Sequence, residues 1–192
     1  MSQKGNLEQV KQIFAYVDQE DITVEEMGVK NNKVNRRNMP TLVETNTFYW
    51  ARTPLILAAM NGHHQVCDYL ITEQKADLEA IDDDQWTALI HAGYKNHTAV
   101  IKVLLQHNAN VKAKTKYGGH AAYMAARSGY LDALKMLVER DEDVIDLTDV
   151  DGKTPLIAAS KSGMIDVCKY LVEEKNANVN LKDNLGRSCI IF

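Results

Sequence analysis

Six histidines are the side chains of this sequence best suited to bind a metal ion or to act as a general base. A zinc site draws its ligands from closely spaced His and Cys pairs, with a second pair completing the tetrahedron. None of the His, Cys or acidic pairs in the sequence is matched by a second pair at such a spacing. We therefore expect no metal site, and no motif in the chain predicts a cofactor.

Two short stretches could carry other chemistry. Asp82, Asp83 and Asp84 stand in a row, as acidic residues do in calcium loops, but the glycine and the final bidentate glutamate of such loops are absent. Gly118 and Gly119 form a lone pair rather than a phosphate-binding loop, and no serine lies in the glycine-flanked turn of a nucleophile elbow. The sequence therefore predicts no enzymatic activity.

A small basic cluster could contact nucleic acid; it comprises Lys112, Lys114, Lys116 and Arg127. Nucleic-acid binding needs a basic stripe, with stacking aromatics for single strands, whereas this chain has a formal net charge of -4 with both signs interspersed. We expect the cluster to face neighbouring aspartates, and we expect no nucleic-acid partner.

Targeting segments are the next feature to consider. No stretch approaches the roughly 18 consecutive apolar residues of a membrane span. The N-terminal stretch lacks the apolar core of a signal peptide. We expect a cytoplasmic protein with no membrane partner, while export by a non-Sec route stays open.

The elements that must position these residues are clearest between residues 149 and 180. Asp149 and Gly152 predict a turn, because Asp can bond its own backbone and Gly adopts positive φ readily. Thr154 and Pro155 then begin a short helix, the hydroxyl capping it and proline suiting its first position. A second helix is predicted from Met164 to Glu174, where apolar residues recur at helical spacing.

This unit recurs along the chain. Its threonine position is occupied by Thr53, Thr87, His120, Thr154 and Ser188, at steps of 34, 33, 34 and 34 residues. Such a period indicates stacked units that bury their apolar faces against one another. The stretches TPLILAAMNGH, TPLIAASKSG, KADLEAIDD and NANVNLKD resemble the ankyrin repeat. The resemblance implies an all-α solenoid of stacked antiparallel helix pairs, with β-hairpin or turn fingers projecting at right angles.

We expect a single domain over residues 1–192. Its predicted parts are a partial N-terminal repeat (1–17), an insertion (18–47), four full repeats (48–81, 82–115, 116–148 and 149–182) and a truncated repeat (183–192). The insertion is expected to be a solvated loop, with an accessory contact surface as the alternative. In the second repeat the helices are predicted at Pro54–Met60 and His64–Thr72. The partial first repeat is either an end cap or the cut edge of a longer protein.

Three further expectations follow from the repeat. Cys67, Cys168 and Cys189 are predicted to be small core residues without disulfides, because their repeat positions are apolar. Leu104 and Leu137 are predicted to be buried on second helices. The apolar last residues have no partner helix, so either the parent protein continues or they fold back on repeat five.

The resemblance also implies a binding face, since ankyrin ligands contact finger tips and the exposed end of each first helix. Carried over by position, the candidate partner-binding residues are Tyr49, Trp50, Arg52, Met60, Asn61, Asp83, Asp84, Trp86, Tyr94, Lys95, Lys116, Tyr117 and Arg127. Trp, Tyr and Arg are the residue types that most often anchor interfaces. The alternative is that Trp50 and Trp86 only pack against each other and the insertion.

Two functions from different classes remain. The first is a monomeric protein-interaction scaffold that binds a partner protein through its finger tips and concave helix face. The second is a regulatory or substrate-recruiting segment of a larger enzyme or channel, whose chemistry lies outside these residues.

Overall fold

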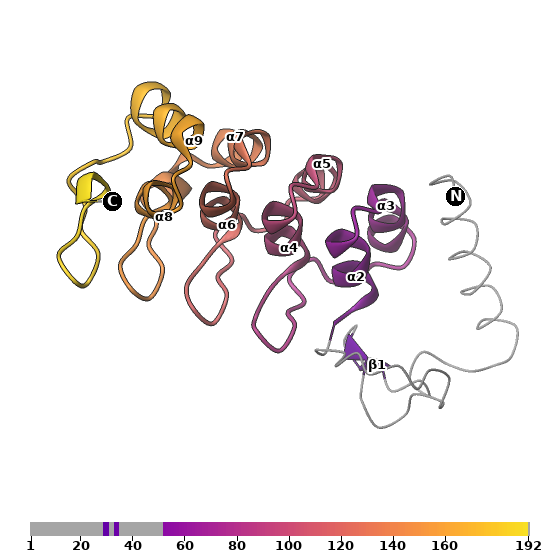
Figure 1. The fold of residues 1–192 in the computed structure, drawn as a ribbon. Helices are drawn as coiled ribbons and strands as arrows, with labels where there is room; N and C mark the ends of the chain where they lie inside the picture. The colour runs from indigo at the N-terminus through magenta and orange to yellow at the C-terminus, as the bar shows by residue number, and fades with distance from the viewer. Residues whose placement is uncertain (1–28, 31–32, 35–51, 192) are drawn as a thin grey trace, which may run out of the picture.

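Four antiparallel helix pairs stack side by side in the part of the chain that the computed structural model describes, residues 29–30, 33–34 and 52–191. The pairs are α2 (Pro54–Met60) with α3 (His64–Thr72), α4 (Ala88–Tyr94) with α5 (Thr98–Gln106), α6 (Ala121–Ser128) with α7 (Leu131–Arg140), and α8 (Pro155–Lys161) with α9 (Ile165–Lys169). Figure 1 shows α2, α4, α6 and α8 in one row, the inner row, and their partners in a second, outer row. Loops project from the inner row as a series of fingers. The predicted solenoid is confirmed.

Each inner helix begins at the repeated threonine position. The hydroxyls of Thr53, Thr87 and Thr154 accept a hydrogen bond from the backbone N–H three residues later, at 3.3, 3.3 and 3.2 Å. His120 takes the same place in α6, where its Nδ1 accepts from the N–H of Tyr123 at 3.4 Å. These caps satisfy donors that the first helical turn leaves without partners, as the sequence predicted.

The fingers are built by a side chain that bonds its own backbone. Asp149 Oδ1 accepts from the N–H groups of Asp151 and Lys153, each at 2.9 Å, and Gly152 has φ +78°. Both features were predicted. In the third repeat Gln85 occupies the glycine position at φ 61°, which sequence analysis did not flag. Neighbouring fingers are tied by single backbone bonds, such as Val150 N–H to the carbonyl of Tyr117 at 3.1 Å.

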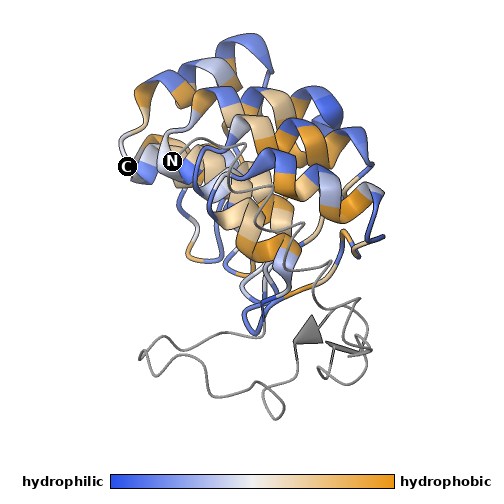
Figure 2. Cartoon of the chain, turned by 90° about the vertical axis from the view of Figure 1, so that its right-hand side faces the viewer, coloured by the Kyte–Doolittle hydropathy of each residue, from blue (hydrophilic) through white to orange (hydrophobic). Residues whose placement is uncertain are grey.

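The core lies between the two rows of helices and is continuous from repeat to repeat. Leu104 and Leu137 are fully buried there, as predicted. In Figure 2 the helices alternate hydrophobic and hydrophilic stretches, which is the pattern of amphipathic helices, and the fingers are mostly hydrophilic. All three cysteines are free, but only Cys67 is buried. Cys168 and Cys189 are half-buried and pack against the edge of this core.

Three short helices complete the described chain: η1 (Glu142–Ile145), η2 (Tyr170–Glu174) and η3 (Cys189–Ile191). The outer helix of repeat five was predicted to run unbroken to Glu174, but α9 ends at Lys169 and continues as the π-helical η2. The hydroxyl of Ser160 on α8 donates to the carbonyl of Cys189. The last residues therefore fold back on repeat five, one of the two outcomes expected.

A two-stranded antiparallel ladder lies within the insertion. Strand β1 (Val29–Lys30) pairs with β2 (Lys33–Val34), with Val29 opposite Val34. Strand pairing within the insertion was not predicted from the sequence. Two asparagines separate the strands in the sequence. The partial first repeat (1–17), Tyr49 and Trp50 lie outside the described residues.

Two finger glycines provide a matched test of how closely the fingers stack. Gly118 and Gly186 share nearly the same φ, 77° and 76°, but a Cβ on Gly118 would lie 2.7 Å from the backbone N of Val150, while one on Gly186 meets nothing within 4 Å. Gly186→Ala should cost about 1 kcal/mol, the strain of positive φ alone. Gly118→Ala should cost at least about 1 kcal/mol more in urea unfolding, because the next finger must move. Equal losses would show that the fingers are not held at this spacing.

Candidate partner-binding groove

Two adjoining hollows lie between the fingers and the inner helices, and we call them together the groove. The first has a volume of about 510 Å³ and the second about 320 Å³. Side chains of repeats three to five line the first, among them Trp86, Tyr94, Tyr117, Tyr123, Met124, Arg127, Asp149, Val150, Asp151, Lys153 and Lys161. The second is lined by Arg52, Met60, Asp82, Asp84, Trp86, His91, Tyr94 and Lys95.

Trp86 and Tyr94 line both hollows. Trp86 is half-buried; its ring centroid lies 5.4 Å from that of Tyr94 in a T-shaped arrangement and 4.9 Å from the ring of His91. Tyr94 is 41% exposed. Edge-to-face pairs stabilise the positions of both rings. The two rings therefore form one aromatic surface that lines both hollows.

Tyr117 lies at the tip of the finger of repeat four, with 63% of its surface exposed. The ammonium of Lys116 lies 4.9 Å from its ring centroid and also pairs with Asp84 of the preceding finger. The basic cluster was expected to face aspartates, and this contact together with Lys112 to Asp143 at 2.6 Å confirms it for two of its members.

The floor of the second hollow holds a buried polar cluster. Nε2 of His91 donates to Oδ2 of Asp82 at 2.9 Å, and Nε of Arg52 lies 3.7 Å from the same oxygen. Burial lowers the pKa of His91, and the hydrogen bond to Asp82 offsets part of that effect. Sequence analysis did not connect His91 with Asp82.

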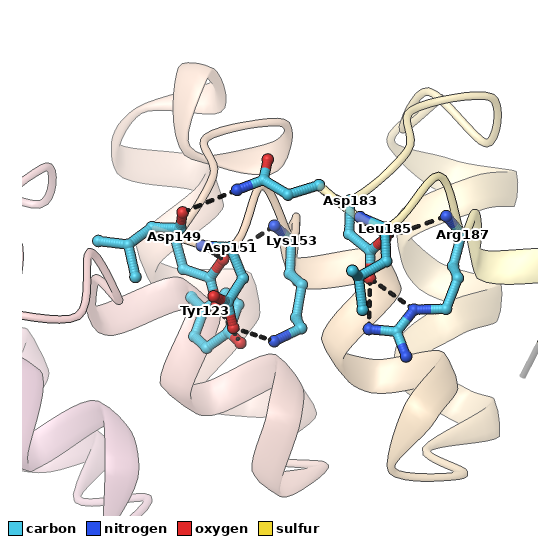
Figure 3. Close-up of polar contacts among 9 residues, drawn as sticks. Tyr123, Asp149, Asp151, Lys153, Asp183, Leu185 and Arg187 are labelled. Atoms are coloured by element: carbon cyan, nitrogen blue, oxygen red, sulfur yellow. Dashed lines mark hydrogen bonds and ion pairs between the residues drawn. The ribbon is translucent and has the colours of Figure 1, made fainter.

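Sequence analysis also missed Tyr123, which lines the first hollow from α6. It is buried, and its hydroxyl donates to Oδ2 of Asp149 at 2.9 Å, a contact drawn in Figure 3. Burial is the main cause that raises the pKa of Tyr123, and this hydrogen bond is the second. The signal was the replacement of TPLI by HAAY in repeat four, which puts a tyrosine on a first helix.

The carboxylates of the fingers already have partners. Figure 3 shows these contacts: Asp149 accepts a hydrogen bond from the backbone of its own turn, Asp151 pairs with Lys153, and Asp183 pairs with Arg187. The pKa of Asp183 is lowered, chiefly by its hydrogen bond with Arg187. Within the described residues no group of three or more His, Cys, Asp or Glu side chains could hold a metal ion.

The structure places most of the candidate partner-binding residues on the groove. Those lining it are Arg52, Met60, Asp84, Trp86, Tyr94, Lys95, Tyr117 and Arg127. Asn61, Asp83 and Lys116 do not line either hollow. The side-chain amide of Asn61 donates to the carbonyl of Leu57 at 2.8 Å, and Lys116 pairs with Asp84. Tyr49 and Trp50 lie outside the described residues, as does any contact of Trp50 with Trp86.

The family model described as "Ankyrin repeats (3 copies)" matches residues 1–115 and 107–183. The chain belongs to the ankyrin repeat family. The resemblance noted in the sequence, which implied stacked helix pairs with projecting fingers, is therefore confirmed. None of the helices in the described ranges is long and apolar enough to cross a membrane.

Curated relatives of this ankyrin repeat protein are much longer than it is. It is 33% identical over 101 residues to "Probable E3 ubiquitin-protein ligase XBOS32" of Oryza sativa subsp. japonica, a match covering 52% of this chain and 20% of the relative. It is 35% identical over 97 residues to "Protein fem-1 homolog A-like" of Mus musculus, covering 47% and 14%. It is 28% identical over 109 residues to "Transient receptor potential cation channel subfamily A member 1 homolog" of Caenorhabditis elegans, covering 56% and 9%. The matches thus span a fifth or less of each relative.

Proposed function

We propose that this ankyrin repeat protein is a cytoplasmic, monomeric protein-interaction module that binds a partner protein through the groove. One observation carries the proposal: Trp86, Tyr94 and Tyr117 converge on one hollow of about 510 Å³ from three separate elements. Aromatic side chains beside a hollow are the usual anchors of interfaces. The three free cysteines support a reducing compartment.

Selection from a displayed library of random peptides tests the proposal without knowledge of the partner. The wild-type protein is the bait, and each enriched peptide is measured against two variants. Tyr117→Ala should weaken binding by about 2 kcal/mol, because it removes an exposed anchor at the rim of the hollow. Trp86→Ala should weaken it similarly, but that ring also packs against the core, so its melting temperature must be compared.

Ile165→Ala is the matched control, since Ile165 is 66% exposed at the start of α9, away from the groove. It should leave the affinity unchanged. Enriched peptides that bind all three variants as tightly as the wild type would place binding elsewhere on the surface. A circular dichroism spectrum of Tyr117→Ala that matches the wild type would show that the variant is folded.

A second candidate function rests on the relatives, which include a probable ubiquitin ligase and a cation channel homologue. We propose as the alternative that the chain is the recruiting or regulatory segment of a larger enzyme or channel. Mass spectrometry of the native protein tests this. A native polypeptide well above 21.6 kDa would support the alternative, and one of that mass would oppose it.

A further inference from the structure

Acidic side chains on the finger side of the groove already form ion pairs within the protein. On the finger side, Asp84 pairs with Lys116 and Asp151 pairs with Lys153. Asp82 is likewise occupied, by a hydrogen bond from His91 and by Arg52. The acidic side chains of the fingers therefore have little capacity left to attract a basic ligand.

Basic side chains lie on the opposite side of the groove, at the C-terminal ends of successive inner helices. They are Lys95 after α4, Arg127 in the last turn of α6 and Lys161 at the end of α8, and all three are exposed. Lys95 lines the second hollow, while Arg127 and Lys161 line the first. Among the described residues, no salt bridge joins Lys95 or Arg127 to a carboxylate, although the ammonium of Lys95 lies 5.3 Å from the ring centroid of Tyr94.

The spacing of this basic row sets the spacing of a ligand. Helices α4 and α6 pack against each other, as do α6 and α8, and packed helices lie about 8 to 10 Å apart. An extended peptide advances about 3.3 to 3.6 Å per residue. Three residues of an extended ligand therefore cover one repeat.

We infer that the groove selects an extended acidic segment of its partner, with carboxylates about three residues apart facing Lys95, Arg127 and Lys161. This inference rests on the proposed function and names the chemistry of its ligand. Apolar side chains of the same segment would enter the first hollow against Tyr117 and Val150, both exposed at finger tips. Carboxylates set the register along the row, and the aromatic surface supplies apolar burial.

A basic residue at a helix C-terminus also stabilises the helix by opposing its dipole. That role is independent of any ligand and affects only folding. Binding measured separately from stability therefore distinguishes the two roles.

The probe is a fluorescein-labelled peptide of about twelve residues with glutamate at every third position and leucines between them. An isomer with its glutamates contiguous and a peptide with lysine in place of glutamate are the controls. Fluorescence anisotropy against the wild-type protein should give tighter binding for the spaced peptide than for either control, and binding should weaken as salt is added.

Arg127→Glu should weaken binding of the spaced peptide by about tenfold or more, because the reversal replaces an attraction to the peptide's carboxylate by a repulsion. Lys95→Glu should act in the same direction. Lys102→Glu, on an exposed position of the outer helix α5, is the matched control for net charge and should change affinity by less than about twofold. Thermal melts confirm that each variant is folded.

Equal affinity of Arg127→Glu and the wild type would overturn the inference, and so would an equal loss in Lys102→Glu or tighter binding of the lysine peptide. Library peptides that lack acidic residues yet lose affinity for Tyr117→Ala would remove this inference and leave the proposed function standing. Library peptides indifferent to Tyr117 would remove the proposed function itself.

Discussion

Replacing Leu137 by alanine is expected to lower the free energy of unfolding by about 2 to 5 kcal/mol. Leu137 is fully buried on α7, where that helix packs against both α5 and α6. Truncation removes apolar contacts and leaves a cavity, because the packing of α7 against α5 and α6 limits how far the helix can collapse into it. In a solenoid, each repeat is stabilised only by its neighbours, so damage at a central repeat uncouples the two ends.

Urea unfolding monitored by circular dichroism measures this loss. Leu185→Ala is the matched control, because Leu185 is the same residue type, 75% exposed at a finger tip, and should change stability by less than about 0.5 kcal/mol. A loss under about 1 kcal/mol for Leu137→Ala would mean that α7 does not pack in the register seen here.

The helices were predictable because their signals are local. Thr and Pro at the start of the second repeat, and the glycine between its helices, gave bounds of Pro54–Met60 and His64–Thr72 that match α2 and α3. Asn96 stands where the second repeat has the glycine between its helices, and it has φ 58°. Capping and backbone preference act within a few residues, so one sequence carries them.

Side-chain pairing between repeats was harder to predict. Lys116 pairs with Asp84, and His97 Nε2 faces the carbonyl of Met60 at 3.1 Å, across separations of 32 and 37 residues. The ring of His97 therefore bridges to the preceding repeat. Such contacts depend on how repeats superpose, which the period suggests but does not specify. The lining of the groove was also only partly predicted, because Tyr123 and Asp82 line it beside the residues that the family's geometry indicated.

His120 is expected to make the protein sensitive to acid. It is fully buried at the start of α6, where Nδ1 accepts from the N–H of Tyr123 and Nε2 lies 3.3 Å from the carbonyl of Leu147, to which it donates. Burial lowers its pKa from the usual 6.5 to about 4, although the hydrogen bond to Leu147 acts in the opposite direction. A protonated ring would also lose the lone pair that caps α6, because both nitrogens would then be donors.

The sign of the effect follows from this lowered pKa. The unfolded chain takes up a proton near pH 6.5 and the folded chain only near pH 4, so stability is full above about pH 6.5 and falls as the pH drops towards 4. The loss from this residue should be about 2 kcal/mol between about pH 7 and pH 5. His120→Thr keeps a helix cap of the type used by the other repeats and removes the titrating group.

Urea unfolding of both proteins at these two pH values isolates the contribution of His120, because other groups, including His91, titrate alike in each. The wild-type protein should lose about 2 kcal/mol more than His120→Thr on acidification. Equal losses would show that His120 is accessible to protons in the folded state and that its burial does not control acid stability. A larger loss in His120→Thr would show instead that the histidine is held charged, which its surroundings oppose since burial disfavours the imidazolium form.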